Sequence, residues 1–247
     1  KEKVFNKTNT ANTFKEYSLQ YIEDLHSEKR YAQFGSSRAQ VNKMIEFLGD
    51  YATFSALTVN HIKKFKVFLK SNYNQSQRSI VNHLIVLRAI CNKAIRDGLM
   101  NKNDYPFGGE GVVIRIPNSI KVGLNLEEIK LLELAKIKSF TSKWNARNAF
   151  LLSFYFAGAR ISDVLRIKWT DIVDGRLHYK MGKNNKVGSI AVAKKANDIL
   201  EQYKTKRWSK EEFVLPELNN ADLSDEKDVY RKIITATKKY NKWLKIL

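Results

Sequence analysis

Apolar residues recur at helical spacing in four segments of the first hundred residues, and this recurrence limits the fold more than any other feature of the chain. Residues three and four apart lie on one face of a helix, so each segment predicts an amphipathic helix with one buried side. Thr13 with Glu16 three residues later is the capping-box pattern that begins a helix. Short polar turns join the segments, which predicts a small four-helix bundle with helices at about 14–25, 36–48, 58–69 and 80–97.

The helical pattern breaks between Asn101 and Gly123. This segment holds two of the three prolines and four of the eleven glycines of the chain. Such residues interrupt regular elements and gather in the segments that join domains. We therefore predict a helical domain over residues 1–105, a linker over 106–123 and a second domain over 124–247.

The second domain is predicted to combine helices with one small β-hairpin. Asn125 with Glu128 begins a helix, and residues 144–157 form a helix that is apolar nearly all round and therefore central. A turn at Asp174–Gly175 precedes two strand-like segments, which are separated by a polar tip. These strands span residues 176–181 and 187–192, and helices resume at about 195–206 and 227–247. The expected fold class is mainly α with a small β-hairpin or sheet.

The chain is strongly basic, with 44 Lys and Arg against 25 Asp and Glu and a net charge of +19. The excess is present in both parts, with 17 basic against 10 acidic residues up to position 110 and 27 against 15 after it. A nucleic acid that contacts both domains fits this distribution, because each phosphate contact releases condensed counterions. The alternative is a generally basic protein without such a partner.

Cysteine and histidine usage exclude several kinds of site. The single Cys91 excludes an internal disulfide and a cysteine-rich zinc site, and its place on an apolar helical face predicts core packing. The four histidines show no metal-ligand spacing, so no metal site is expected. No signal peptide is apparent, and the apolar run 149–159 is too short to span a bilayer. We expect a cytoplasmic protein in a reducing compartment.

Polar side chains on the outer faces of the first domain are candidates for nucleic-acid contact. Taken singly, each is an ordinary solvated side chain. In a basic chain, however, a polar segment at a helix start suits phosphate groups, because helix N-termini present N–H donors. The candidates are Lys63, Lys66, Gln75, Gln77 and Arg78.

Arg160 stands two residues after an apolar run that stops at Gly158. A guanidinium is a planar fork of donors that keeps its charge and matches two phosphate oxygens at once. Asp163, one helical turn later, is placed to hold the guanidinium, and Ser162 is placed to cap the short helix that follows. On spacing alone, an ordinary Arg–Asp surface pair is the commoner interpretation.

Lys183 lies at the tip of the predicted hairpin, between Gly182 and Asn184. An ammonium group at a hairpin tip can enter a groove, approach a phosphodiester and donate a proton to a leaving oxygen. Lys186 is the neighbouring candidate for DNA contact or for the same role. The alternative is a polar turn lysine without a chemical function.

Two motifs together resemble one known family. Residues 157–172, A-G-A-R-I-S-D-V-L-R-I-K-W-T-D-I, resemble the first catalytic arginine motif of the tyrosine recombinases, the phage integrase family. Residues 181–192, M-G-K-N-N-K-V-G-S-I-A-V, are similar to the β-hairpin that carries the catalytic lysine of that family. The four-helix segment resembles its SAM-like core-site DNA-binding domain. The resemblance covers nearly the whole chain, and the two motifs in this order are far more specific than either alone.

The resemblance implies site-specific DNA recombination without a cofactor. In the family a tyrosine attacks the scissile phosphate, which gives a 3′-phosphotyrosyl link and a free 5′-hydroxyl that attacks the partner duplex. Covalent catalysis keeps the bond energy in the intermediate. By this carry-over Arg160 clamps the phosphate, Asp163 supports it structurally and Lys183 is the general acid. The implied partner is double-stranded DNA, bound by a homotetramer of chains that are monomeric when free, with no membrane.

The same resemblance leaves part of the active site unaccounted for. After the lysine the family has a His-x-x-Arg box, a later His or Trp and the nucleophilic tyrosine, and none of these follows here. Tyr230 and Tyr240 lie outside the nucleophile context, and Tyr240 is better interpreted as an aromatic residue on a helix face. We therefore expect a partial catalytic domain, in a chain that binds DNA and is inactive by itself. The alternatives are a member that binds without cutting and a type IB topoisomerase-like enzyme.

Overall fold

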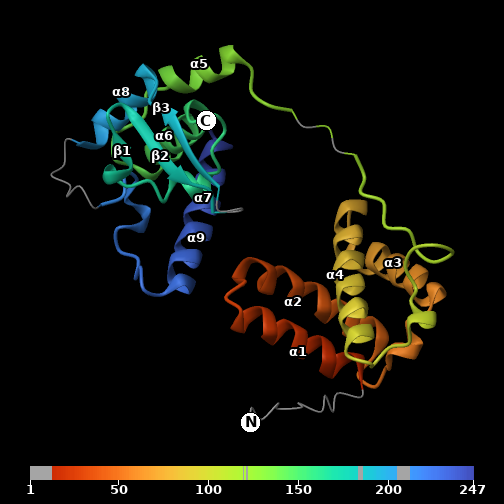
Figure 1. Cartoon of the computed structure of the whole chain (residues 1–247). Helices are drawn as coiled ribbons and strands as arrows, with labels where there is room; N and C mark the ends of the chain where they lie inside the picture. The colour runs from red at the N-terminus through yellow and green to blue at the C-terminus, as the bar shows by residue number, and fades with distance from the viewer. Residues whose placement is uncertain (1–12, 119, 121, 183–185, 205–211) are drawn as a thin grey trace, which may run out of the picture. The chain divides into compact units, whose positions relative to one another are not determined.

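The computed structural model describes residues 13–118, 120, 122–182, 186–204 and 212–247 (Figure 1). The chain divides into two compact units, Lys1–Lys121 and Val122–Leu247. The division falls in the segment 106–123 that the sequence marks as a linker, while the limits of the two domains stay a prediction. Each unit has its own hydrophobic core.

Among the described residues, four α-helices build the first unit. They are α1 (Phe14–Ser27), α2 (Tyr31–Leu48), α3 (Val59–Tyr73) and α4 (Gln77–Arg96), with short 3-10 helices at Phe54–Ala56 and Lys102–Asp104. The capping box of Thr13 and Glu16 begins α1, and α4 ends shortly before Gly98, which has a φ of +76°. The prediction of a four-helix unit is confirmed.

The helix α2 begins at Tyr31, five residues before the predicted start at Ser36. The extra turn carries Phe34, which packs on the core and beside His26 of α1, with ring centroids 4.9 Å apart. That contact joins residues of two helices, so helical spacing within one segment does not report it.

The core of the first unit is formed by the faces that the periodicity predicts. Ile62 and Phe65 of α3 are buried together with Leu87 and Cys91 of α4. Burial raises the pKa of the Cys91 thiol to about 12, so this group is neither a nucleophile nor a metal ligand at neutral pH. The prediction that Cys91 packs in the core is confirmed.

His83 of α4 is a buried histidine with 4% of its surface exposed. Its ring meets the ring of Phe65 edge-on at 5.9 Å, and burial together with the charge of Lys43 lowers its pKa to about 4. The unfolded chain, with the ordinary histidine pKa near 6.5, binds this proton more readily. Stability is therefore complete above pH 6.5 and falls as the pH drops toward 4, by on the order of 3 kcal/mol.

We expect His83→Leu to remove this component of the acid sensitivity. The measurement is the free energy of urea unfolding, followed by the helical signal, at several pH values between 7.5 and 4. His61→Gln is the control, because His61 is an exposed histidine of α3. If His83→Leu lost as much stability as the wild type over this interval, the buried histidine would not be the cause.

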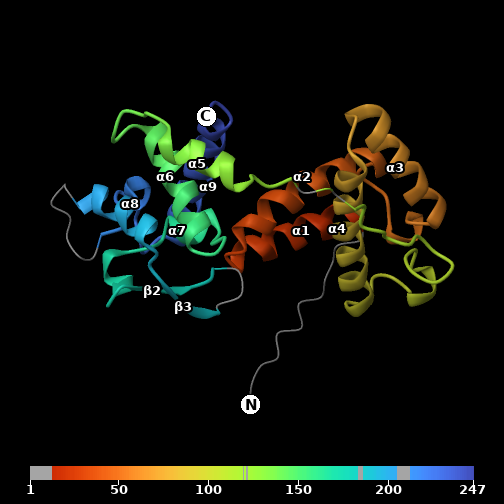
Figure 2. The ribbon, with the colours of Figure 1, turned by 90° about the horizontal axis from the view of Figure 1, so that it is seen from above.

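The second unit places helices against a small antiparallel sheet. Its strands lie in the order β1-β2-β3, with Arg176 opposite Ala191 and Lys180 opposite Val187. In Figure 2 the helices lie on one side of β2 and β3. The mainly α fold with a small sheet is confirmed. The elements are α5 (Leu126–Leu134), α6 (Ser142–Tyr155), α7 (Ile161–Val164), β1 (Ile172–Val173), β2 (Arg176–Lys180), β3 (Val187–Ala191), α8 (Lys194–Lys204) and α9 (Glu226–Leu244), with 3-10 helices at Trp169–Asp171 and Pro216–Leu218.

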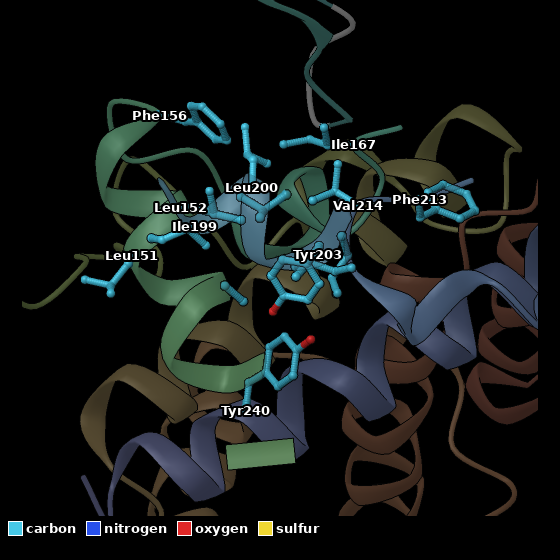
Figure 3. Packing of buried hydrophobic residues seen from close by; sticks show 14 of the residues in the cluster. Leu151, Leu152, Phe156, Ile167, Ile199, Leu200, Tyr203, Phe213, Val214 and Tyr240 are labelled. Atoms are coloured by element: carbon cyan, nitrogen blue, oxygen red, sulfur yellow. The ribbon is translucent and has the colours of Figure 1, made fainter. Parts of the chain in front are cut away.

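The helix α6 is central to the second unit. Leu151 and Leu152 of α6 and Phe156 just after it belong to one buried cluster with Leu200 and Tyr203 of α8 (Figure 3). This cluster supports the end of α6 from which the chain continues to Arg160. The burial of this apolar run agrees with the sequence.

The prediction that residues 144–157 are apolar nearly all round is wrong for the first half of α6, where Asn145, Arg147 and Asn148 are buried. Arg147 donates two hydrogen bonds to the Asn148 side-chain oxygen, at 2.9 and 3.0 Å. It donates a third to the Ala135 carbonyl at 2.9 Å, and the Tyr203 hydroxyl donates to Asn145 at 3.1 Å. These groups tolerate burial because they bond to one another and to partners outside α6.

Candidate functional site

A tight turn after α6 fixes the backbone that leads to Arg160. Ala157 and Gly158 have positive φ values, +54° and +76°, and such residues end a helix abruptly. The N–H groups of Gly158 and Ala159 donate to the Ser153 carbonyl at 2.9 and 3.1 Å, and the Ser153 hydroxyl donates to the Ala159 carbonyl at 2.5 Å. Arg160 follows directly, so its backbone is anchored to the central helix.

The Arg160 side chain reaches the surface, whereas the Asp163 side chain beside it is nearly buried. The two side chains are 48% and 9% exposed. A guanidinium nitrogen of Arg160 lies 3.8 Å from Asp163 Oδ2, which is an ion pair but too long for a hydrogen bond. The predicted pairing therefore exists as a charge contact without a direct hydrogen bond.

The predicted cap at Ser162 is wrong. The helix α7 begins at Ile161, and its N-cap is Arg160, whose carbonyl accepts from the N–H groups of Asp163 and Val164 at 2.8 and 2.9 Å. The helix starts earlier than predicted because the turn ends at Ala159 and Arg160 is already extended, with φ −65° and ψ 143°. Ser162 lies within the first turn of α7.

Asp163 also joins α7 to the hairpin. The backbone N–H of Gly182, just after β2, donates to Asp163 Oδ1 at 3.1 Å. A Cβ atom at position 182 would lie 3.1 Å from the same oxygen, so glycine suits this close approach. The Met181 N–H donates to the Lys186 carbonyl at 2.8 Å, which pairs the two sides of the hairpin. One carboxylate thus contacts both the arginine and the hairpin.

One predicted residue of this site cannot be placed beside the others. Lys183 follows Gly182 in the sequence but lies outside the described residues, so its place beside Arg160 stays a prediction. Lys186 is exposed on the return side of the hairpin. The contact of Gly182 with Asp163 is the described feature closest in sequence to Lys183.

We expect Asp163→Ala to release this end of the hairpin. Hydrogen bonds to charged acceptors contribute roughly 1.5–3 kcal/mol, so the Gly182 amide should exchange with solvent at least about tenfold faster. The measurement is amide hydrogen exchange resolved at Gly182. Asp171→Ala is the matched control, because the Asp171 carboxylate accepts from the Lys168 N–H in a different turn. Equal exchange at Gly182 in the wild type and Asp163→Ala would refute the link.

The candidate contact residues of the first unit lie on α3 and at the start of α4. Lys63 and Lys66 are exposed and three residues apart, so they share one face of α3. Gln77 and Arg78 are exposed in the first turn of α4, which Ser76 caps and which holds no acidic residue. Gln75 is half-buried, and its side-chain oxygen is enclosed. A contact through Gln75 would therefore use the rest of its side chain.

Tyr240 lies in the core of the second unit, with 1% of its surface exposed. Its hydroxyl points toward that of Tyr203 in Figure 3. Burial and the Glu217 carboxylate raise the pKa of Tyr240 well above its ordinary value. A neutral, enclosed phenol cannot attack a phosphodiester. The interpretation of Tyr240 as an aromatic residue on a helix face is confirmed, and that face of α9 is buried.

In the described part of the chain, no group of three or more His, Cys, Asp or Glu side chains is placed to hold a metal ion. Over the same residues, no helix has the length and apolar character needed to cross a bilayer.

Two family models match the sequence. The phage integrase SAM-like domain matches residues 13–112, and the phage integrase family matches residues 125–245. A comparison with curated protein sequences gives no match. The two matched ranges end and begin at residues 112 and 125, and the division between the units, after Lys121, falls between them.

Several solved structures share this fold. A lambda integrase tetramer bound to a Holliday junction aligns with 97% of this chain and 70% of its own, with a TM-score of 0.63 and 18% identity. A dimer of lambda integrase (75–356) bound to a COC′ core site aligns with 93% of this chain and 82% of its own, with a TM-score of 0.63 and 18% identity. The Tn1549 transposon integrase in complex with a circular intermediate DNA aligns with 80% of this chain and 67% of its own, with a TM-score of 0.59 and 16% identity. At these identities the likeness concerns the fold alone.

Proposed function

Because this chain belongs to the phage integrase family, whose members are tyrosine recombinases, we propose that it serves site-specific DNA recombination through a 3′-phosphotyrosyl intermediate. The single observation that carries the proposal is the position of Asp163, which contacts both Arg160 and the hairpin at Gly182. A rigid turn and the start of the hairpin tip thereby meet at one carboxylate. The net charge of +19 suits a DNA partner.

Arg160 is the proposed phosphate clamp. Its guanidinium is half-exposed, while its backbone is held by the turn after α6. Two parallel N–H donors match two non-bridging oxygens of a phosphodiester. As the nucleophile adds, negative charge grows on those oxygens, and a fixed cation stabilises that charge more in the transition state than in the ground state.

Lys183 is the proposed general acid. When the tyrosine oxygen forms its bond to phosphorus, the bond from phosphorus to the 5′-oxygen breaks. That leaving oxygen needs a proton, which the Lys183 ammonium would supply. The tyrosine gives up its phenolic proton as it attacks. In the second step the freed 5′-hydroxyl attacks the phosphorus of the phosphotyrosyl link and returns its proton to Lys183, while the tyrosine leaves and takes up a proton. The sequence calls for no metal or cofactor in these steps.

Asp163 is a positioning residue in this proposal. Its carboxylate accepts from the Gly182 N–H, and its charge keeps the Arg160 guanidinium near the hairpin. It does not touch the phosphate in this mechanism. The exposed residues Lys63, Lys66, Gln77 and Arg78, with the half-buried Gln75, are proposed to contact DNA from the first unit, and Lys186 from the second.

We also propose that the chain is monomeric when free and assembles as a homotetramer on DNA. The lambda integrase tetramer bound to a Holliday junction supports this assembly, since it shares the fold. Mass measurements with and without a synthetic junction would test it. A cytoplasmic location fits the same proposal, because the substrate is cellular or element DNA.

The proposal is tested with a suicide substrate. Duplexes that bind residues 1–247 are first selected from a random pool, and the selected sequence is then nicked beside each phosphate in turn. The complete gene-encoded protein should form a covalent adduct on one nicked duplex, and peptide mapping should place the adduct on a tyrosine. Residues 1–247 alone should bind the duplex and form none. A complete protein that binds the selected duplex but gives no adduct at any nick would refute the proposed chemistry.

A further inference from the structure

The outer face of the sheet in the second unit carries a row of basic side chains. Along β2 the side chains alternate, and Arg176, His178 and Lys180 are exposed while Leu177 is buried. Figure 2 shows the helices of this unit on the other side of β2 and β3. The row therefore faces solvent, away from the core.

The strand beside β2 leaves this row uncovered. In the register of the sheet, Ala191, Ser189 and Val187 of β3 lie opposite Arg176, His178 and Lys180 and are themselves exposed. On the other side, Val173 of β1 lies opposite Arg176. These neighbours are neutral and mostly small, so they neither neutralise nor shield the basic side chains. We refer to Arg176, His178 and Lys180 as the β2 row.

The spacing of the β2 row suits a phosphate backbone. Alternate residues of a strand are about 6.8 Å apart, so the row places three donors at regular steps along one line. Neighbouring phosphate groups of a DNA strand are separated by a comparable distance. The repeated step of the phosphates, together with the net charge of +19, favours a nucleic-acid backbone over a protein surface as the partner of this row.

Arg176 is held in place on this face. Its Nε donates a hydrogen bond to the Ser189 hydroxyl at 2.9 Å. One of its terminal nitrogens donates a longer one, at 3.4 Å, to the Ser189 carbonyl oxygen. A guanidinium that is already ordered loses less conformational entropy when it binds a phosphate. The hydrogen bonds therefore prepare Arg176 for a contact beyond the sheet.

The β2 row runs toward the proposed active site. The strand β2 ends at Lys180, and two residues later Gly182 meets Asp163, the partner of Arg160. We propose that the β2 row binds the phosphate backbone of the substrate duplex beside the cleavage site, as a contact surface distinct from Arg160. This inference rests on the proposed function, because it takes DNA as the substrate.

The test measures how salt weakens binding of residues 1–247 to a selected, fluorescently labelled duplex. Each phosphate contact contributes about 0.9 to the slope of log affinity against log salt. We expect the double variant Arg176→Gln/Lys180→Gln to lower that slope by about 1.8 and to weaken binding tens of fold at 0.1 M salt. Lys180→Gln alone, which leaves the Arg176–Ser189 contact in place, should lower the slope by about 0.9.

The matched control is Lys130→Gln/Lys136→Gln, which removes the same charge from exposed residues in or just after α5 of the same unit. We expect its slope to stay near the wild-type value. If the control lowered the slope as much as the double variant, net charge would explain the effect and the β2 row would be refuted. The proposal would also be refuted if both β2 variants kept the salt slope of the wild-type chain. If the wild-type chain bound no duplex, the result would refute the proposed function itself, before the β2 row is tested.

Discussion

Arg160→Ala is expected to slow covalent adduct formation by roughly 10²- to 10³-fold in the complete protein, or about 3–4 kcal/mol of transition-state stabilisation. The reason is that a fixed turn presents Arg160, and in the proposed mechanism its guanidinium meets the phosphate where negative charge grows. The affinity for the duplex should fall only by the contribution that a single phosphate contact makes to binding. The measurement is the single-turnover rate of adduct formation on the nicked duplex, beside an equilibrium binding curve.

Two further variants separate this role from net charge. Arg166→Ala removes an exposed arginine just after α7 and should leave the rate of adduct formation nearly unchanged. Arg160→Lys keeps the charge but loses the planar fork, so its rate should lie between those of the wild type and Arg160→Ala. If Arg160→Ala weakened binding and cleavage by the same factor, Arg160 would be an ordinary DNA contact and not a transition-state clamp.

Lys183→Ala is expected to lose roughly 10²- to 10⁴-fold in the cleavage rate, the usual range for a general acid. A substrate with sulfur in place of the leaving 5′-oxygen should restore the rate, because a thiolate leaves without needing a proton. The decisive measurement is the ratio of rates on the sulfur and oxygen substrates. This ratio should rise strongly in Lys183→Ala compared with the wild type.

Lys186→Ala is the matched control, because Lys186 lies on the same hairpin three residues later. Its ratio of rates should stay near the wild-type ratio, although its DNA binding should weaken. Arg160→Ala offers a second comparison, since sulfur substitution should not rescue a lost clamp. If the sulfur substrate failed to rescue Lys183→Ala, Lys183 would be a polar turn residue and the general acid would have to be sought elsewhere.

Local signals made the helices and the hairpin predictable. The capping boxes at Thr13 and Asn125 were visible as residue pairs three apart, and both are present in the structure. The turn at Asp174–Gly175 and the two strands after it followed from turn residues and alternation, and the strands pair as expected. These features depend on neighbours within a few residues, which a sequence displays directly.

Contacts between elements were not predictable to the same degree. The buried Arg147 appears in the sequence as one more charge in a helix, yet its partners include the Ala135 carbonyl, twelve residues away. The short helix after Arg160 was assigned the wrong cap, because the turn with positive φ values at Ala157 and Gly158 is closed by hydrogen bonds to Ser153 and leaves Arg160 as the cap. Helical spacing carries no information on such partners.

The sequence by itself determined the fold class, the family and the identity of Arg160 and Lys183 as candidates, because motif order and periodicity are properties of the chain alone. Only the tertiary structure decided that Asp163 bonds the hairpin at Gly182 and that Arg176, His178 and Lys180 share an uncovered face. The physical reason is the distance along the chain over which each interaction acts. Caps and periodicity act over three or four residues, whereas a hydrogen bond across nineteen residues exists only after the two segments have packed together.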